Sequence, residues 1–408
     1  MALPLLFLQL NHEHAWRIDN AMDLLTSFFP SAAEAHERFV KHDLLQPIRS
    51  EFFHGLDPNL LSISLRVYVA MALLLFLWLA REPIAHWLLG GAMPDGRRHR
   101  WLRAVYAFFA DKPLEGAAFV RMGDWAYGFL MRSPALVLMY SAANYALIMP
   151  SFPLERSTAA VFQYAQVLAA IAIITQTALP FIGAAIFGTF FLYLLPAYGW
   201  SVAVDVLPVL TIALVYVSSP CRLFGNEAPR LTPRQVRWVR LTLGFSFLAL
   251  GWMKAYNHEL IIGLADNYPW VMDDLLIKLF YAGTDPRCQR ECWSVAFAGC
   301  EVMAGFLIML GVFTRFWAVQ MVLIFGKLMV VDFGWAEIPH VYPIAGFLVL
   351  AVSNHLSDEL HGVGALAAHV ASEGKRKTRT WIASAVASIL PLLALVPMSY
   401  LVMLIARR

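Results

Sequence analysis

The chain contains ten apolar stretches, each close to the roughly 20 residues that an α-helix needs to cross a bilayer. They lie at 60–80, 124–148, 159–179, 181–197, 201–219, 240–256, 294–313, 316–331, 338–354 and 381–403. Backbone groups in hydrocarbon must pair with one another, so only helices and closed barrels span a bilayer. Apolar runs without strict alternation favour helices. The sequence therefore predicts an all-α, polytopic transmembrane bundle of about ten spans.

Composition supports this fold class and narrows the function. Apolar residues make up 60% of the 408 residues and charged residues 14%, whereas a soluble protein has about 25% charged residues. The formal net charge of +3 gives no basic footprint for a nucleic acid. The four cysteines form neither a CxxC pair nor a zinc-type spacing with histidine, so no metal site is predicted. The partner implied first is the lipid bilayer.

Three basic loops predict the orientation. Their basic residues are Arg81, Arg97, Arg98, Arg100, Arg103, Lys112 and Arg121; then Arg222, Arg230, Arg234, Arg237 and Arg240; then Lys375, Arg376, Lys377 and Arg379. With ten spans all three loops fall on one side, which the positive-inside rule makes the cytoplasmic side of a bacterial inner membrane. Residues 1–59, without the basic start of a signal peptide, and the loop 257–293 are then outside. We expect both segments to contact other membrane or periplasmic subunits.

An internal repeat divides the chain. Tyr198-Gly199-Trp200 recurs 135 residues later as Phe333-Gly334-Trp335, and Pro208 with Pro343 and Ser218 with Ser353 keep that offset. The pattern predicts two parallel four-helix units, 119–220 and 238–355, preceded by a span and basic loop at 60–118 and followed by a linker and span at 356–408. Coincidence among apolar residues is the alternative explanation.

Ionisable residues gather in the second unit. Gln166 and Leu192 of the first unit correspond to Glu301 and Lys327 of the second. Ionisable groups inside spans are costly and are functional candidates by default. The predicted topology puts the candidate catalytic residues at one depth near the outer face: Lys254, Glu301 and His340. Supporting residues at or near span ends are His258, Arg315, Lys327, Asp332 and Glu337.

The chemistry of this set suits proton transfer. A Lys beside a carboxylate can stay charged in a low dielectric, and a His exchanges protons near neutral pH. Such groups fit proton-coupled chemistry on a lipid-soluble molecule such as a quinone. Structural explanations compete with this one. Lys254 and Lys327 could extend to the outer surface, Asp332 and Glu337 could be solvated turn residues, His340 could be structural, and Arg315 could anchor a cytoplasmic turn.

Cys288 and Cys292 lie in the predicted outer loop, in DPRCQRECW. An oxidising compartment permits a disulfide there, and a helical i, i+4 spacing puts both on one face, near the upper limit of Cα separation for bonding. Two unpaired thiols are the alternative.

Two segments of the second unit resemble DoxX/DoxD-type membrane proteins. They are VRLTLGFSFLALGWMKAYN at 239–257 and FAGCEVMAGFLIMLGVFTRFWA at 297–318. The pattern positions are Arg240, Gly244, Gly251, Lys254, Glu301, Gly305, Gly311, Thr314 and Arg315. The chain is also weakly similar to the membrane domain of vitamin K-dependent carboxylase-like (HTTM) proteins.

The resemblance implies a membrane subunit of a redox system. DoxD-type proteins are subunits of thiosulfate:quinone oxidoreductase, so a quinone at the outer face of the second unit is the expected ligand. No flavin, haem or iron–sulfur motif is visible in the sequence, so a partner subunit is expected to hold the electron-transfer centre. A non-catalytic anchor or assembly subunit, a small-molecule transporter and a carboxylase-like enzyme are the alternatives.

Overall fold

The protein is all-helical over the part of the chain that the computed structural model describes. That part comprises residues 58–81, 84, 100–114, 116–150, 152–154, 156–221, 231–256, 261–262, 265–266, 269–327, 338–354 and 356. Within these ranges there is no β-strand, and Ala146 and Pro153 form one isolated bridge. The predicted last span and the N-terminal segment 1–57 lie outside the described residues.

Helices occupy most of the described part of each predicted span from 60–80 to 338–354. They are α3 (Pro58–Leu79), α5 (Arg100–Phe109), α6 (Ala117–Arg132), α7 (Pro134–Ala143), α8 (Arg156–Ile174), α9 (Leu179–Thr189), α10 (Leu195–Val217), α11 (Pro233–Tyr256), α13 (Leu275–Tyr281), α14 (Gln289–Leu310), α15 (Thr314–Lys327) and α16 (Val341–Val352). Short π and 3₁₀ turns add η4 (Phe190–Leu194), η5 (Pro269–Asp273) and η6 (Pro286–Cys288).

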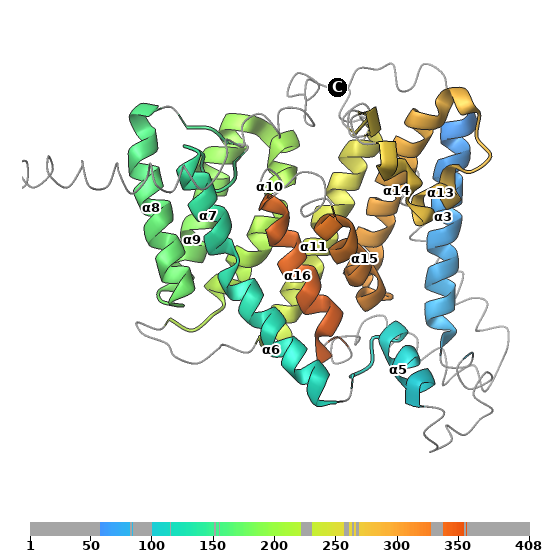
Figure 1. Ribbon diagram of the computed structural model, residues 1–408, viewed down its shortest axis with the longest axis horizontal. Helices are drawn as coiled ribbons and strands as arrows, with labels where there is room; N and C mark the ends of the chain where they lie inside the picture. Colours follow the sequence, from blue (N-terminus) through green and yellow to red (C-terminus); the bar gives the residue numbers. More distant parts are fainter. Residues whose placement is uncertain are drawn as a thin grey trace, which may run out of the picture.

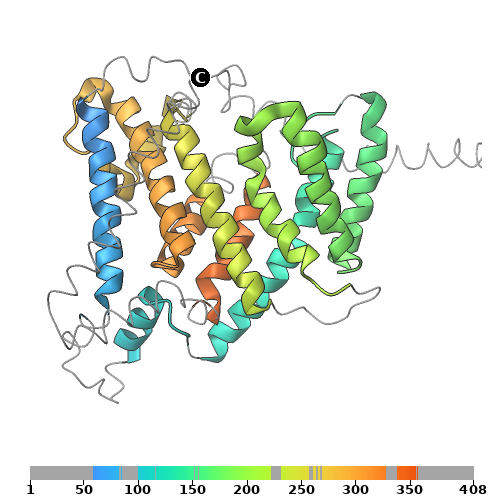
Figure 2. The ribbon, with the colours of Figure 1, turned by 180° about the vertical axis from the view of Figure 1, so that it is seen from behind.

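The long helices stand side by side and alternate in direction (Figure 1). α8 and α9 lie on one flank, α11 and α16 in the middle, and α14, α15 and α3 on the other flank. The short helix α13 lies at one end of the bundle, beside the start of α14. The helix α5 lies at the opposite end in both views (Figures 1 and 2). These two ends are called the α13 end and the α5 end below.

One predicted turn is helical instead. We expected separate spans at 181–197 and 201–219, joined by a turn at 198–200. In the structure α9, η4 and α10 follow one another without a loop, and the chain arches over so that α9 and α10 pack together (Figure 2). The π turn η4 and the prolines Pro196 and Pro208 explain the bend, because both features interrupt regular helical hydrogen bonding. The predicted span 124–148 likewise divides, at Pro134, into α6 and α7.

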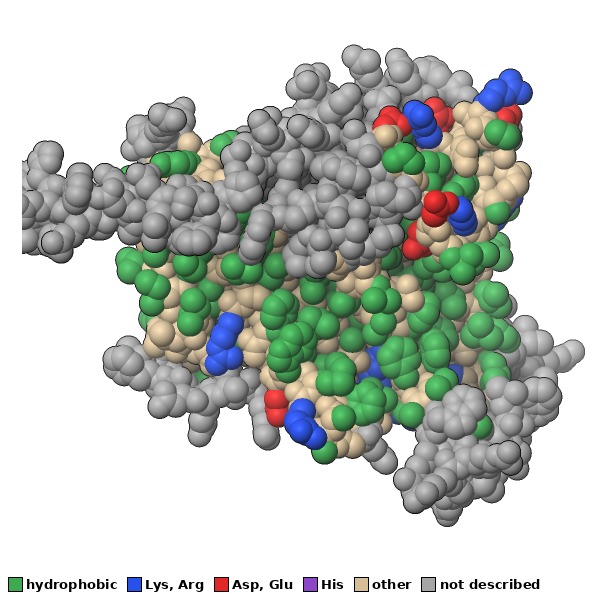
Figure 3. All heavy atoms as spheres, viewed as in Figure 1, with side chains coloured by type: hydrophobic (Ala, Val, Ile, Leu, Met, Phe, Trp, Pro, Cys, Tyr) green, Lys and Arg blue, Asp and Glu red, His purple; other side chains and the backbone are tan. Residues whose placement is uncertain are grey.

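Two of the described helical stretches, Ser62–Leu79 and Pro286–Leu310, are long and apolar enough to cross a membrane. Shorter apolar helical stretches include Ala159–Ile174 and Leu179–Leu194. Large apolar side chains are exposed on several helices, including Leu192 (82% exposed) and Val161 (72%). Figure 3 shows apolar side chains over the middle of this face and charged side chains mostly toward its ends. A surface with so many large apolar side chains is unfavourable in contact with water.

The turns between α8 and α9 and between α14 and α15 have the same backbone form. Each contains two residues with positive φ: Gln176 and Ala178 in the first, Gly311 and Phe313 in the second. Each turn also closes with a six-to-one backbone hydrogen bond of the Schellman type, from Thr177 N to Ala172 O (2.8 Å) and from Val312 N to Leu307 O (2.8 Å). All these matched residues are 135 positions apart, which is the offset of the predicted repeat.

Helix contacts follow the same correspondence. α7 packs on α8 as α11 packs on α14, and α9 packs on α10 as α15 packs on α16. Between the proposed units, α10 contacts α11 and α16 contacts α6. Such reciprocal contacts are those expected of two units related by an approximate two-fold axis.

Glycines bring α11 and α14 into close contact. A Cβ atom on Gly251 would lie 2.6 Å from the backbone N of Val302 and 2.8 Å from the carbonyl O of Ala298. Gly244 of α11 and Gly305 of α14 face each other in the same way. Small residues that let helix backbones approach are typical of helix pairs in membranes. This contact fixes how the last turns of α11 face the middle of α14.

The close contact predicts an asymmetric response to alanine. Gly251→Ala should lower the free energy of unfolding by roughly 1–3 kcal/mol, because the new methyl group meets backbone atoms that cannot move aside. Gly188→Ala in α9 is the matched control, because nothing lies within 4 Å of its added Cβ. The control should be neutral or slightly stabilising. Unfolding of the purified protein in detergent measures both; equal effects would show that the helices are not in contact at Gly251.

Candidate functional site

An ion pair joins the two helices that the glycines bring together. Lys254, in the last turn of α11, lies with its Nζ 2.7 Å from Oε1 of Glu301 in α14. The side chain of Glu301 is 5% exposed and that of Lys254 is 19% exposed. Lys254 Nζ also lies 5.2 Å from the centre of the Phe297 ring, which adds a cation–π attraction. The carboxylate is therefore buried, whereas the ammonium group keeps a route to the surface.

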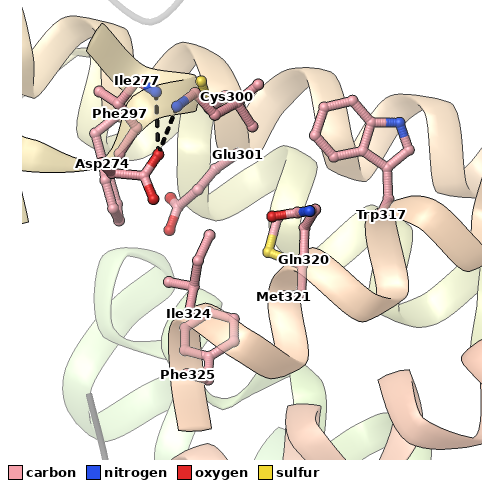
Figure 4. A pocket seen from close by; sticks show the side chains of 11 residues that line it. Asp274, Ile277, Phe297, Cys300, Glu301, Trp317, Gln320, Met321, Ile324 and Phe325 are labelled. Atoms are coloured by element: carbon pink, nitrogen blue, oxygen red, sulfur yellow. Dashed lines mark hydrogen bonds between the residues drawn. The ribbon is translucent and has the colours of Figure 1, made fainter. Parts of the chain in front are cut away.

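A narrow cavity lies beside Glu301. Three elements line it: the start of α13 (Asp274, Leu276, Ile277), α14 (Phe297, Cys300, Glu301) and α15 (Trp317, Gln320, Met321, Ile324, Phe325). Its volume of about 20 Å³ has room for about one water molecule. The lining is mostly apolar, and Figure 4 shows the Asp274 and Glu301 carboxylates on the same side of it. Polar chemistry in this cavity is thus confined to a few side chains.

Asp274 is a site residue that the sequence analysis missed. Its Oδ1 accepts hydrogen bonds from the backbone N of Leu276 (2.9 Å) and Ile277 (3.1 Å), so it caps α13. The signal was an Asp directly before the apolar run LLIKLF, which is the pattern of a helix N-cap. That pattern predicts the cap but not the cavity, because the position of α13 depends on contacts distant in sequence.

His340 reaches the same region indirectly. Its ring stacks on Phe325, with 4.8 Å between ring centres, and Phe325 lines the cavity. The structure thus brings Lys254 and Glu301 together and puts His340 behind the cavity wall. The predicted supporting residues His258, Asp332 and Glu337 lie outside the described residues. Lys327 ends α15, and its side chain is likewise not described.

The residue that corresponds to Glu301 in the first unit has a structural role. Gln166 donates to the carbonyl O of Ala146 (2.8 Å) and accepts from the backbone N of Ile148 (2.7 Å). These two hydrogen bonds hold the loop between α7 and α8, and the Gln166 side chain carries no charge. The amide of Gln166 is enough to hold this loop, whereas the second unit has the charged Glu301 at the matching position.

Arg315 belongs to a different cluster and not to the Lys254 site, in keeping with the alternative prediction that it anchors the turn between the two spans. It lies in the first turn of α15. The part of α14 that follows Glu301 is roughly 14 Å long, so Arg315 and Glu301 lie at different depths in the bundle. Its buried guanidinium donates to three backbone carbonyls, of Ala107, Lys112 and Ser353. Arg315 therefore ties together three segments at the α5 end.

Asp111 belongs to the same cluster, and Arg315 and Asp111 with their backbone partners are called the clasp below. Asp111 accepts hydrogen bonds from the backbone N of Thr314 (2.8 Å) and of Arg315 (3.0 Å), so it caps α15 from the loop that follows α5. Burial raises the pKa of Asp111 to about 6, and those two hydrogen bonds and the charge of Arg315 oppose the rise. Burial lowers the pKa of Arg315, against the charge of Asp111. At neutral pH the carboxyl group is therefore mostly ionised.

The cysteines of the predicted outer loop are bonded to each other. Cys288 and Cys292 form a disulfide with Cα atoms 5.6 Å apart, and both are buried. The bond joins η6 to the first turn of α14, so it holds the segment that leads from α13 into the helix of Glu301. Cys300 is a free, buried cysteine that lines the cavity. Within the described ranges, no three His, Cys, Asp or Glu side chains are grouped to hold a metal ion.

No protein-family model matches the chain, and no curated protein or solved structure is significantly similar to it. The likeness to DoxX-type proteins thus stays a prediction from residues 239–257 and 297–318.

Breaking the ion pair should have unequal effects on stability. Lys254→Met leaves a buried carboxylate without its counter-charge and should cost about 3 kcal/mol or more. Glu301→Leu should cost less, because Lys254 can turn its ammonium group toward the surface. The double variant should recover much of the loss. Lys278→Met is the control, since it breaks the exposed pair with Asp273 (2.6 Å) and should cost less than about 1 kcal/mol. Additive single effects in detergent unfolding would contradict the pairing.

The clasp predicts a pH dependence of stability. The pKa of Asp111 is raised in the folded chain, so the folded state binds this proton more tightly than the unfolded state. The resulting stability is present below the ordinary pKa and is lost as the pH rises through about 6. As the pH is raised from about 4 to about 7, the midpoint temperature of unfolding of the wild type should therefore decrease relative to that of Asp111→Asn. A parallel pH course in the two proteins would show that Asp111 does not titrate in this range.

Proposed function

We propose that the chain is a polytopic protein of the bacterial inner membrane, with about ten spans and two parallel four-helix units. The apolar exposed surface supports this assignment, as do the alternating directions of the helices and the stretches Ser62–Leu79 and Pro286–Leu310. The α13 end then faces the periplasm and the α5 end, with its basic loops, faces the cytoplasm. The two similar turns support a duplicated unit.

We propose further that the second unit carries a DoxX-like, quinone-linked redox site at its outer face. The observation that carries this proposal is the Lys254–Glu301 pair, buried between apolar helices near the α13 end. A charge pair in such surroundings is costly unless it is well compensated. The first unit uses an uncharged Gln166 at the matching position, so the fold itself does not demand a charge there.

The residues suggest a division of roles. Reduction of a quinone to a quinol consumes two electrons and two protons. The electrons come from a small reduced substrate, such as a reduced sulfur compound, through a partner subunit. Lys254 donates a hydrogen bond to a carbonyl oxygen of the quinone and polarises it. Glu301 holds Lys254 in place. Each of the two protons passes from the Lys254 ammonium group to a reduced quinone oxygen, and Glu301, after taking up a proton itself, returns that proton to the Lys254 amine.

The size of the cavity limits how a quinone could approach. About 20 Å³ beside Glu301 holds one water but not an aromatic ring. The ring would therefore meet the pair from the side of Lys254, which is the more exposed partner. A quinone would therefore contact Lys254 before Glu301.

A non-catalytic assembly subunit is the second candidate. The α13 end carries exposed ion pairs that could dock on another subunit, including Arg290 with Asp266 (2.6 Å) and Lys278 with Asp273 (2.6 Å). In that case the Lys254–Glu301 pair would serve only helix packing. Purification in mild detergent separates the two functions: a stable complex whose activity survives Glu301→Gln supports assembly.

Glu301→Gln should lower the rate of quinol formation by about 100-fold, because the amide cannot supply a proton. The assay follows quinol formation by membranes that contain the chain and its partners, with a reduced sulfur compound as donor. Glu291→Gln is the matched control, since Glu291 is exposed in the first turn of the same helix. Equal rates for wild type and Glu301→Gln would remove Glu301 from the mechanism.

A further inference from the structure

The buried carboxylate needs a proton route if it takes part in chemistry. The side chain of Glu301 is 5% exposed and lies on a helix face packed against α11 and close to α13 and α15. A proton that leaves Glu301 toward a substrate must be replaced from water. The cavity is the space beside Glu301 through which that replacement can occur.

Asp274 lines this cavity on the same side as Glu301 (Figure 4). Its Oδ1 is engaged in capping α13, and Figure 4 shows its other carboxylate oxygen on the side of Glu301. The residue is half-buried, and it follows η5 at the α13 end. Asp274 is therefore in reach of both solvent and the cavity.

The other elements around Glu301 offer few competing groups. α11 presents Lys254, which is the partner of Glu301. α15 lines the cavity with Gln320 and apolar side chains, none of which titrates, and α14 itself adds Cys300. On the far side of Phe325 lies His340. The Arg66 guanidinium of α3 is held by the carbonyls of Phe280 (3.0 Å) and Ala282 (2.8 Å).

We propose that Asp274 relays protons between the outer solvent and Glu301 through the water-sized cavity. This inference rests on the proposed function, since it supplies the proton that Glu301 gives to Lys254. In each transfer Asp274 passes one proton through the cavity to the Glu301 carboxylate and takes one proton from outside water. A single water in the cavity completes the path, because about 20 Å³ accommodates one. Asp274 acts on Glu301 and not on the substrate, so it is a relay residue.

The test measures proton arrival at Glu301 directly and needs no enzymatic activity. A rapid drop in pH is applied to the purified full-length chain in detergent, and infrared absorption of protonated carboxyl groups is followed. The band that disappears in Glu301→Gln reports Glu301. In Asp274→Asn this band should grow at least about tenfold more slowly, because the relay group is missing. Added formate, a small diffusible acid, should restore the rate.

Two features make the variant specific. Asn is as good a helix cap as Asp, so α13 should stay folded in Asp274→Asn, and an unchanged unfolding midpoint would verify this. Asp285→Asn is the control, since Asp285 caps η6 in the same way (2.9 Å to the Arg287 N) but does not line the cavity. Its rate should equal that of the wild type.

Each other outcome overturns the relay. Equal rates in Asp274→Asn and wild type would show another route, and equal slowing in Asp285→Asn would show an effect on the loop as a whole. A complete lack of a Glu301-dependent band would show that no proton reaches this residue. The proposed function can fail separately, because a working relay with unchanged quinol formation in Glu301→Gln would leave proton delivery intact without quinone chemistry.

Discussion

The close approach of α11 and α14 is the constraint on which the candidate site depends. Gly244, Gly251 and Gly305 remove the side chains that would keep these helices apart. The resulting contact puts Lys254 and Glu301 at 2.7 Å, where each charge compensates the other in surroundings that would otherwise exclude both. A charge pair between apolar helices is strong only while its geometry holds. The disulfide at the start of α14 and the capped α13 hold the segments next to this pair at the α13 end.

The second constraint lies at the opposite end of the same helices. Arg315 and Asp111 connect the loop after α5, the turn between α14 and α15, and the end of α16. The equivalent turn of the first unit has the same backbone form without this clasp, since position 180 is a proline. The two units thus share a framework and differ in charge.

Much of this arrangement could be predicted from residue types and spacing. The length of the apolar runs located α3, α8, α11 and α14, and the cost of charges in hydrocarbon singled out Lys254 and Glu301. The 135-residue offset anticipated the matching turns. Sequence could not show that α9 and α10 join without a loop, because a π turn and prolines bend a continuous helix there. Nor could it find Asp274, since the place of this residue beside the cavity depends on segments that are distant in the chain.

The central claim is that Lys254 and Glu301 are in direct contact inside the bundle. Solid-state NMR of the protein in lipid bilayers, with ¹⁵N-labelled lysine side chains and ¹³C-labelled glutamate carboxylates, measures this contact through the dipolar coupling between the two nuclei. We expect a strong coupling that disappears in Glu301→Gln and persists in Glu291→Gln. A spectrum without a lysine–glutamate coupling that depends on Glu301 would contradict it.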